Sequence, residues 1–174
     1  GIDYLKKSLS IKPENASAHS NLGNALKNLN RYDEALESFD KAIQLNPNFA
    51  DAYSNRGVIL QEMKRFDEAV QSYDSAIKLN PNHFFSHGNK GITLKDLNRY
   101  DEAIKSYDKA IQINPNFIEA YNNKGNALKD LKRFSEALDN YKKILERKPE
   151  YEYNIGRVLH FSMFICDWEN FDKL

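Results

Sequence analysis

The chain has 174 residues, of which 41% are hydrophobic, and its 25 lysines and arginines balance 25 aspartates and glutamates. Because binding to a polyanion needs an excess of positive charge, this neutrality argues against nucleic acid and anionic membrane surfaces as partners. No stretch approaches the roughly 18 apolar residues of a membrane span. No secretory signal opens the chain, and its single cysteine cannot form an internal disulfide. We therefore expect a cytoplasmic protein.

A period of 34 residues runs through the chain. All the prolines recur at this spacing. So do one set of glycines, one set of alanines and two sets of aromatic residues, and each such set of residues 34 apart is called a column. In that order the members are Pro13, Pro47, Pro81, Pro115 and Pro149; Gly23, Gly57, Gly91 and Gly125; Ala35, Ala69, Ala103 and Ala137; Tyr32, Phe66, Tyr100, Phe134 and Trp168; Phe39, Tyr73, Tyr107 and Tyr141. Repeats of this length are typical of arrays built from one supersecondary unit.

Taken in chain order, the spacing of apolar residues predicts short helices in pairs. Within a pair, a segment as short as Lys64–Arg65 leaves room only for a tight antiparallel turn. Each pair ends before a proline, so Asn80 is expected to end the second helix, and asparagine tolerates left-handed backbone geometry at such a position. The expected units are 1–15 (the second helix of a preceding pair), four full pairs at 16–49, 50–83, 84–117 and 118–151, and a partial pair at 152–174.

Two recurring features predict local contacts inside each unit. The glycine column lies in mid-helix, where glycine costs about 1 kcal/mol relative to alanine. We therefore expect the paired helix to pass too close for a Cβ atom, with the alanine column facing it. The second helix of each unit begins near an acidic or hydroxyl side chain that is expected to cap it. These side chains are Asp33, Asp67, Asp101 and Ser135.

The unit resembles the tetratricopeptide repeat. That repeat has a small residue at position 8, alanine at positions 20 and 27, an aromatic residue at 24 and proline at 32. In the second unit these positions hold Gly57, Ala69, Ala76, Tyr73 and Pro81. The resemblance covers almost the whole chain and implies an all-α fold, a right-handed α-α superhelix of antiparallel helix pairs. The first helix of each pair would line the concave face of this solenoid.

The ends of the chain fall inside predicted helices, so we expect it to be a segment of a longer array. A solenoid buries each unit against its neighbour, and an interrupted one exposes apolar side chains. We therefore expect a homo-oligomer formed through the solenoid ends. The side chains expected to be exposed there are Ile2, Leu5 and Leu9 at one end, and Phe164, Trp168 and Phe171 at the other.

Asparagine dominates the predicted concave face. A carboxamide pairs with both the N–H and the C=O of a peptide backbone, so a ladder of asparagines suits an extended chain of any sequence. The alternative is that these side chains bond a neighbouring helix or simply solvate a polar face. Asparagine is a mediocre helix former, which favours a binding role. The candidate peptide-binding residues are Asn21, Asn55, Asn89 and Asn123 of the ladder itself, with Asn24, Asn122, Asn126, Lys27, Lys95 and Lys129 beside it.

The asparagine ladder also resembles that of the protein O-linked N-acetylglucosamine transferases, the SPINDLY-like glycosyltransferases of family 41. The segment from Ile155 to Trp168 is similar to the end of the repeat array in their bacterial members. The resemblance implies an acceptor-recognition region whose catalytic domain would follow Leu174. The alternative is a free-standing scaffold or assembly adaptor. In either case the partner is a protein or an extended peptide in the concave groove.

Other site chemistry has weaker support in the sequence. A clamp for a chaperone C-terminal carboxylate would need lysines at unit positions 2 and 5, and none stands there. His83 and His87 are four residues apart but lack a third metal ligand. Cys166 lacks an evident activating base. We therefore expect no cofactor, no metal and no catalytic residue in this chain.

Overall fold

The computed structural model describes residues 1–149, 156–158, 160 and 162 of the chain. These residues are mainly helical and contain no strand, which confirms the all-α prediction. The helices are α1 (Ile2–Ile11), α2 (Ala16–Lys27), α3 (Tyr32–Leu45), α4 (Ala50–Glu62), α5 (Phe66–Leu79), α6 (Phe84–Asp96), α7 (Tyr100–Ile113), α8 (Ile118–Asp130) and α9 (Phe134–Arg147).

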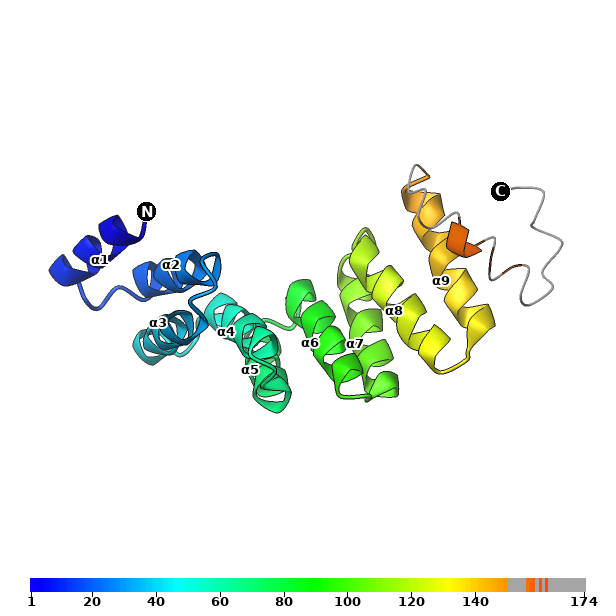
Figure 1. The fold of residues 1–174 in the computed structure, drawn as a ribbon, viewed down its shortest axis with the longest axis horizontal. Helices are drawn as coiled ribbons and strands as arrows, with labels where there is room; N and C mark the ends of the chain where they lie inside the picture. Colours follow the sequence, from blue (N-terminus) through cyan, green and yellow to red (C-terminus); the bar gives the residue numbers. More distant parts are fainter. Residues whose placement is uncertain (150–155, 159, 161, 163–174) are drawn as a thin grey trace.

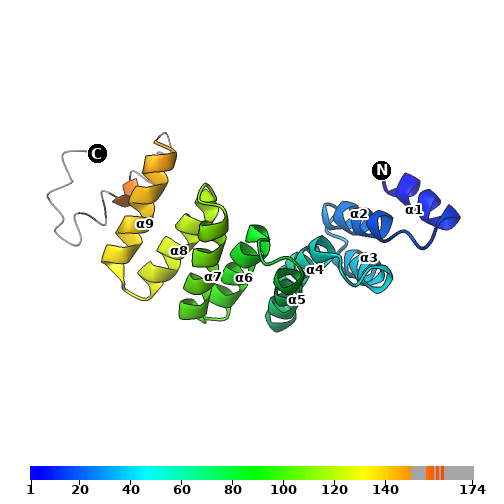
Figure 2. The same cartoon turned by 180° about the vertical axis from the view of Figure 1, so that it is seen from behind.

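The helices pack in consecutive antiparallel pairs, α2 with α3, α4 with α5, α6 with α7 and α8 with α9. The second helix of each pair also packs against the first helix of the next. First helices contact one another directly as well, α2 with α4, α4 with α6 and α6 with α8. The result is a right-handed α-α superhelix, and Figure 1 shows it as an elongated row of helices. Figure 2 shows the same row from behind.

The glycine column allows the two helices of a pair to approach closely, as predicted, but the atoms nearest to it belong to the aromatic column and not to the predicted alanines. A Cβ added to Gly57 would lie 2.7 Å from Cε1 of Tyr73, and one added to Gly91 would lie 2.6 Å from Cε1 of Tyr107. Phe39 and Tyr141 crowd Gly23 and Gly125 in the same way. The aromatic column therefore fills the space that the missing Cβ leaves.

Left-handed backbone geometry occurs at the turn inside each unit and not at its end. Asn80 has a φ of −135° and is extended. The positive φ angles lie between 57° and 61°. In each unit the residue with a positive φ stands two positions before the first residue of the second helix. A left-handed residue there reverses the chain within a very short connection. These residues are Asn30, Lys64, Asn98 and Lys132.

The second helices begin with an arginine–glutamate pair, which corrects the predicted aspartate and serine caps. The N-cap of α5 is Arg65, and no side chain caps its backbone N–H groups. Arg65 instead donates two hydrogen bonds of 2.7 Å to the carboxylate of Glu68. Arg31, Arg99 and Arg133 pair in the same way with Glu34, Glu102 and Glu136. The predicted cap Asp67 lies inside the first turn of α5 and not at its N-cap position.

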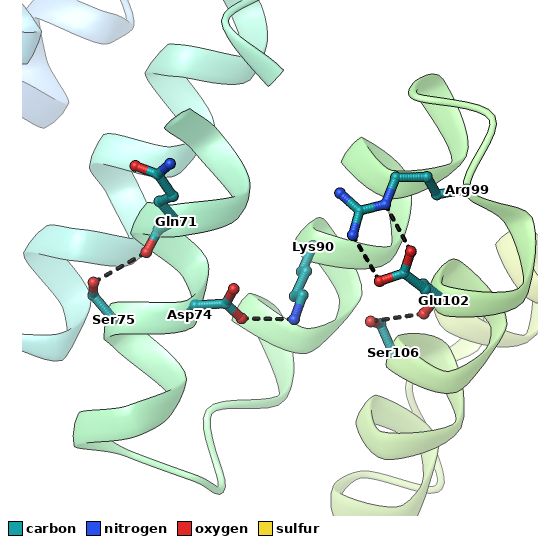
Figure 3. Close-up of polar contacts among 7 residues, drawn as sticks. All are labelled: Gln71, Asp74, Ser75, Lys90, Arg99, Glu102 and Ser106. Carbon is teal, nitrogen blue, oxygen red and sulfur yellow. Dashed lines mark hydrogen bonds and ion pairs between the residues drawn. The ribbon is translucent and has the colours of Figure 1, made fainter. Parts of the chain in front are cut away.

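Consecutive units are also joined by an ion pair at equivalent positions. Nζ of Lys90 in α6 lies 2.6 Å from Oδ1 of Asp74 in α5, a contact drawn in Figure 3 together with the Arg99–Glu102 pair. The equivalent pairs are Arg56 with Asp40 and Lys124 with Asp108. The carboxylates are about half exposed, so each pair contributes little to stability, about 0–1 kcal/mol.

Helix α1 packs differently from the expectation for an exposed end. Leu9 is buried, and Ile2 and Leu5 pack partly against the cluster that contains Leu22 and Phe39. The exposed apolar side chains of α1 are instead Tyr4 and Ile11, at 76% and 79%. The prediction for Phe164, Trp168 and Phe171, like that for Cys166, falls outside the described residues.

Candidate binding groove

A hollow of about 480 Å³, called the main hollow, lies along the first helices α2, α4 and α6. Helix α2 contacts α4, and α4 contacts α6. Side chains at equivalent positions of these helices therefore lie on the same face of the array. Three members of the asparagine ladder line this hollow, Asn21, Asn55 and Asn89. It is also lined by Ser20, Asn24, Lys27, Phe49, Asp51, Ser54, Val58, His83 and Phe85.

The ladder side chains make no hydrogen bond within the described part of the chain. This holds for Asn21, Asn55, Asn89 and Asn123, although three of the four are half-buried. By contrast, Oδ1 of Asn126 accepts a hydrogen bond of 3.0 Å from the hydroxyl of Tyr141. Oδ1 of Asn122 accepts one from Arg157. The structure therefore separates two groups of asparagines, one engaged within the array and one facing the groove.

Lysines of the candidate site also divide into two groups. Lys27 lines the main hollow and makes no ion pair among the described residues. Lys95 and Lys129 line neither of the two groove hollows, and Nζ of Lys129 lies 3.9 Å from Oδ1 of the neighbouring Asp130. Of the predicted cations, Lys27 is thus the one that the fold places with the ladder.

A polar network at the edge of the main hollow holds α6 against α4. His83 caps α6, because its Nδ1 accepts a hydrogen bond of 3.2 Å from the backbone N–H of Ser86. Its Nε2 lies 3.1 Å from Oδ1 of Asp51, and the hydroxyl of Ser86 donates to that of Ser54 at 2.9 Å. A serine, a histidine and an aspartate in contact are also the parts of a hydrolytic triad. Ser86 is completely buried, however, so a substrate cannot reach it.

The two histidines considered as a metal pair have separate structural partners. Nε2 of His87 lies 3.1 Å from the carbonyl oxygen of Pro81, whereas His83 faces Asp51. Burial lowers the pKa of His87, which favours the neutral form of its imidazole. Among the described residues no group of histidine, cysteine and carboxylate side chains could hold a metal ion.

A second hollow of about 310 Å³ continues the groove along α6 and α8. Asn89 and Asn123 of the ladder line it, but the other lining residues are mostly apolar. They are Phe85, Gly88, Ile92, Phe117, Glu119 and Ala120. We did not single out Phe85 and Phe117 from the sequence as binding residues. The available signal was an aromatic residue just before the first helix, at Phe49 and Phe117.

The family follows from matches that repeat along the chain. Residues 16–49, 50–83 and 118–151 each match a family model described as a tetratricopeptide repeat. Residues 72–105 and 91–132 match two further models of the same repeat. The chain belongs to the tetratricopeptide repeat family. Its fold is that of a protein-interaction scaffold, and none of the described helices has the length and apolar character needed to cross a bilayer. No curated protein matches the chain.

Solved tetratricopeptide repeat structures superpose on most of this chain. A crystal structure of MamA has a TM-score of 0.81 at 28% identity, over 87% of this chain and 89% of MamA. PilF of Pseudomonas aeruginosa has a TM-score of 0.83 at 21% identity, over 97% of this chain and 77% of PilF. YrrB, described as having an unusual peptide-binding site, has a TM-score of 0.79 at 22% identity, over 97% of this chain and 87% of YrrB. At their low identities PilF and YrrB support the fold alone.

Proposed function

We propose that this chain binds an extended polypeptide segment in the groove along α2, α4, α6 and α8. The observation that carries the proposal is the unengaged ladder, whose amide side chains line the groove without a hydrogen bond inside the described part of the chain. A half-buried carboxamide without a partner favours binding of a ligand that supplies one. An extended backbone offers an N–H and a C=O at every residue.

The charge of the groove agrees with a polypeptide ligand. Its described lining is dominated by amide, hydroxyl and apolar side chains, with Lys27 at one end and the carboxylates of Asp51 and Glu119 farther along. This mixture lacks the positive excess that a polyanion requires. A backbone clamp of this kind holds a ligand by its peptide groups. The sequence of the ligand would therefore affect its affinity mainly at places where the groove is lined by side chains other than the ladder asparagines.

The test replaces Asn55 and Asn89 together by alanine and measures the affinity for peptides selected from a random library. Alanine is a better helix former than asparagine, so α4 and α6 are expected to stay folded, which circular dichroism checks. We expect a loss of affinity of about tenfold or more, because each lost hydrogen bond to a buried group costs about 1 kcal/mol. The matched control replaces Asn48 and Asn116 by alanine. Both are exposed at the connections between units, so peptide affinity is expected to stay unchanged.

A second arm of this test uses the ligand. N-methylation of alternate backbone amides of a bound peptide removes donors without changing its side chains. We expect this change to weaken binding to the native chain and to have little effect on the Asn55/Asn89 double variant. Unchanged affinity of the folded double variant would instead assign the asparagines to solvation of a polar face.

The parent protein of this groove has two candidates. The glycosyltransferase interpretation rests on the sequence resemblance and would make the groove an acceptor-recognition region. The scaffold interpretation has at least equal support, because the superposed relatives are tetratricopeptide repeat proteins covered over 77–89% of their own chains. The reading frame after Leu174 distinguishes them. A nucleotide-sugar-binding domain supports the first, and a stop codon or further repeats support the second.

Association through the solenoid ends stays a prediction. At the α1 end, Tyr4 and Ile11 are the exposed apolar side chains, and they line a shallow hollow of about 250 Å³ with Lys7 and Ser8. We expect light scattering to report a mass that rises with concentration, and less so for a Tyr4→Lys, Ile11→Lys variant. A monomer at all concentrations would contradict this prediction.

A further inference from the structure

A cluster of three phenylalanines, one of them exposed, lies at the groove between α6 and α8. Phe85 is 53% exposed although it is a large apolar residue. Its ring centroid lies 4.1 Å from that of Phe84 and 5.6 Å from that of Phe117. The rings of Phe84 and Phe117 meet edge to face at 5.1 Å. Contiguous exposed apolar surface in a groove marks an interaction site, and these contacts hold it in a fixed shape.

The repeat pattern breaks at this place. In the third unit, positions 2, 5 and 9 hold Phe85, Gly88 and Ile92, all without a polar group. No other full unit has this combination, and the equivalent residues of the fourth unit are Glu119, Asn122 and Asn126. Because the array is otherwise regular, one apolar unit gives the groove a position where ligands are distinguished by their side chains.

Gly88 leaves space for the ring of Phe117 at the second hollow. A Cβ atom at this position would lie 2.7 Å from Cε1 of Phe117. The equivalent residues in the first two units are Ser20 and Ser54, which line the main hollow. Glycine therefore allows the ring of Phe117, which precedes α8, to fold down onto α6 and close one side of the hollow.

A carboxylate that has no ion-pair partner among the described residues lies at the same hollow, in the first turn of α8. Glu119 lines it, is exposed, and makes no ion pair within the described residues. The apolar side chains around it supply no positive charge. A ligand residue with a cationic side chain would complement Glu119 while its neighbour fills the hollow.

We propose that the hollow formed by Phe85, Gly88, Ile92 and Phe117 takes one bulky apolar side chain, preferably aromatic, of an extended peptide that carries lysine or arginine beside it. This inference rests on the proposed function and names the ligand class. The volume of about 310 Å³ lies at the lower end of the roughly 300–1,000 Å³ range of ligand pockets. It suits a single side chain and not a folded element. Aromatic rings in edge-to-face contact gain beyond their buried area.

The experiment selects binders from a library of random short peptides on the whole immobilised chain. We expect the bound sequences to be enriched in an aromatic or large aliphatic residue next to lysine or arginine. Enrichment of binders without this pair would overturn the inference and leave the proposed function intact. Failure to enrich any binder would count against the proposed function and, with it, against the inference.

Individual peptides then locate the contacts. For a selected peptide, replacing the apolar residue by alanine is expected to weaken binding to the native chain by about tenfold. The same replacement is expected to have little effect on binding to a Phe85→Ala variant, whose folding circular dichroism checks. Full sensitivity to the replacement in both proteins would place the apolar side chain elsewhere.

A charge reversal provides a readout that a folding defect cannot imitate. Glu119 is exposed, so a Glu119→Lys variant is expected to fold. We expect it to bind the lysine-bearing peptide several-fold less tightly, and a partner peptide with glutamate in place of lysine more tightly than the native chain does. A parallel decrease for both peptides would overturn the assignment of Glu119. The Asn116→Ala variant, altered on the connection before α8, serves as the matched control.

Discussion

Tyr107 shows how a repeated residue acquires a different environment in each unit. The hydroxyl of Tyr73 donates a hydrogen bond to Oε1 of Gln61, and that of Tyr141 donates to Oδ1 of Asn126. The hydroxyl of Tyr107 is buried and finds no partner in the described part of the chain. In the unit of Tyr107, Lys95 stands at the position of Gln61 and Ile92 at the position of Asn126, so neither amide is present. Burial raises the pKa of Tyr107, so the orphaned hydroxyl is neutral.

The environment of Tyr107 predicts an unusual effect of removing a hydroxyl. Tyr107→Phe is expected to leave the free energy of unfolding unchanged or to raise it by up to about 1 kcal/mol, since the phenol is desolvated without a hydrogen bond. Tyr73→Phe is the control and is expected to lower it by about 1 kcal/mol. Phe39 already occupies this column in the first unit. Urea denaturation measures both, and equal destabilisation would contradict the prediction.

The glycine column marks where residue-level reasoning from sequence succeeded and where it stopped. A glycine in mid-helix at Gly57 and Gly91 implied close packing, because its cost needs a compensating contact. The facing residue depended on the angle at which two helices cross, which periodicity does not supply. Sequence reasoning named alanine for that role, whereas the rings of Tyr73 and Tyr107 occupy the space.

At the scale of elements, the starts of the second helices predict a specific response to acid. The hydrogen bond from Arg65 lowers the pKa of Glu68 below its ordinary value of 4.5, and Arg99 does the same for Glu102. A carboxylate whose pKa is lower in the folded state contributes stability above its unfolded pKa. That contribution is lost as the pH falls below about 4.5 and through the folded pKa. Both side chains are solvent-exposed, so the effect is screened by salt.

A Glu68→Gln, Glu102→Gln variant isolates this contribution. We expect it to be less stable than the native chain at pH 7, and the difference to shrink as the pH falls through the acid range. Other carboxylates titrate in both proteins, so the difference between them is the quantity to follow. It is measured by thermal unfolding at a series of pH values and low salt. A difference that does not depend on pH would contradict the role given to the pairs.

The turns inside the units predict a stabilising substitution. Lys132 has a φ of 61°, a geometry that costs a residue with a Cβ atom roughly 1–2 kcal/mol. Lys132→Gly removes this strain but adds chain entropy to the unfolded state. We therefore expect a net gain of about 0.5–1 kcal/mol in the free energy of unfolding. Lys132→Asn is expected to gain less, and urea denaturation compares them. A loss on Lys132→Gly would show that the turn is not strained.

At the scale of the whole molecule, the sequence predicted that the ladder asparagines share one face, but it did not predict the apolar second hollow. The asparagine ladder follows from a strict period and the helical repeat, so Asn21, Asn55 and Asn89 were predicted on one face and line one hollow. The second hollow depends on Phe117 folding back over Gly88 from the following unit. Such a contact joins residues whose positions in the repeat differ, so a column-by-column comparison does not reveal it.

The array contains contacts only between neighbouring units in its described part. Helices α2 and α6, for example, share no direct contact although both line the main hollow. In such a solenoid, stability is approximately a sum of the stability of each unit and of its interfaces with its neighbours. A local cavity is therefore expected to weaken nearby helices without unfolding distant ones.

Leu128→Ala tests this local character. Leu128 in α8 is fully buried, and removing its side chain is expected to cost about 2–5 kcal/mol locally. We expect hydrogen exchange followed by mass spectrometry to show faster exchange in α7, α8 and α9, with α2 and α3 unchanged. Leu26→Ala in α2, also fully buried, is the mirror control and is expected to reverse the pattern. Faster exchange along the whole array in both variants would mean that the units unfold as one cooperative body, and the groove would then form or be lost as a whole.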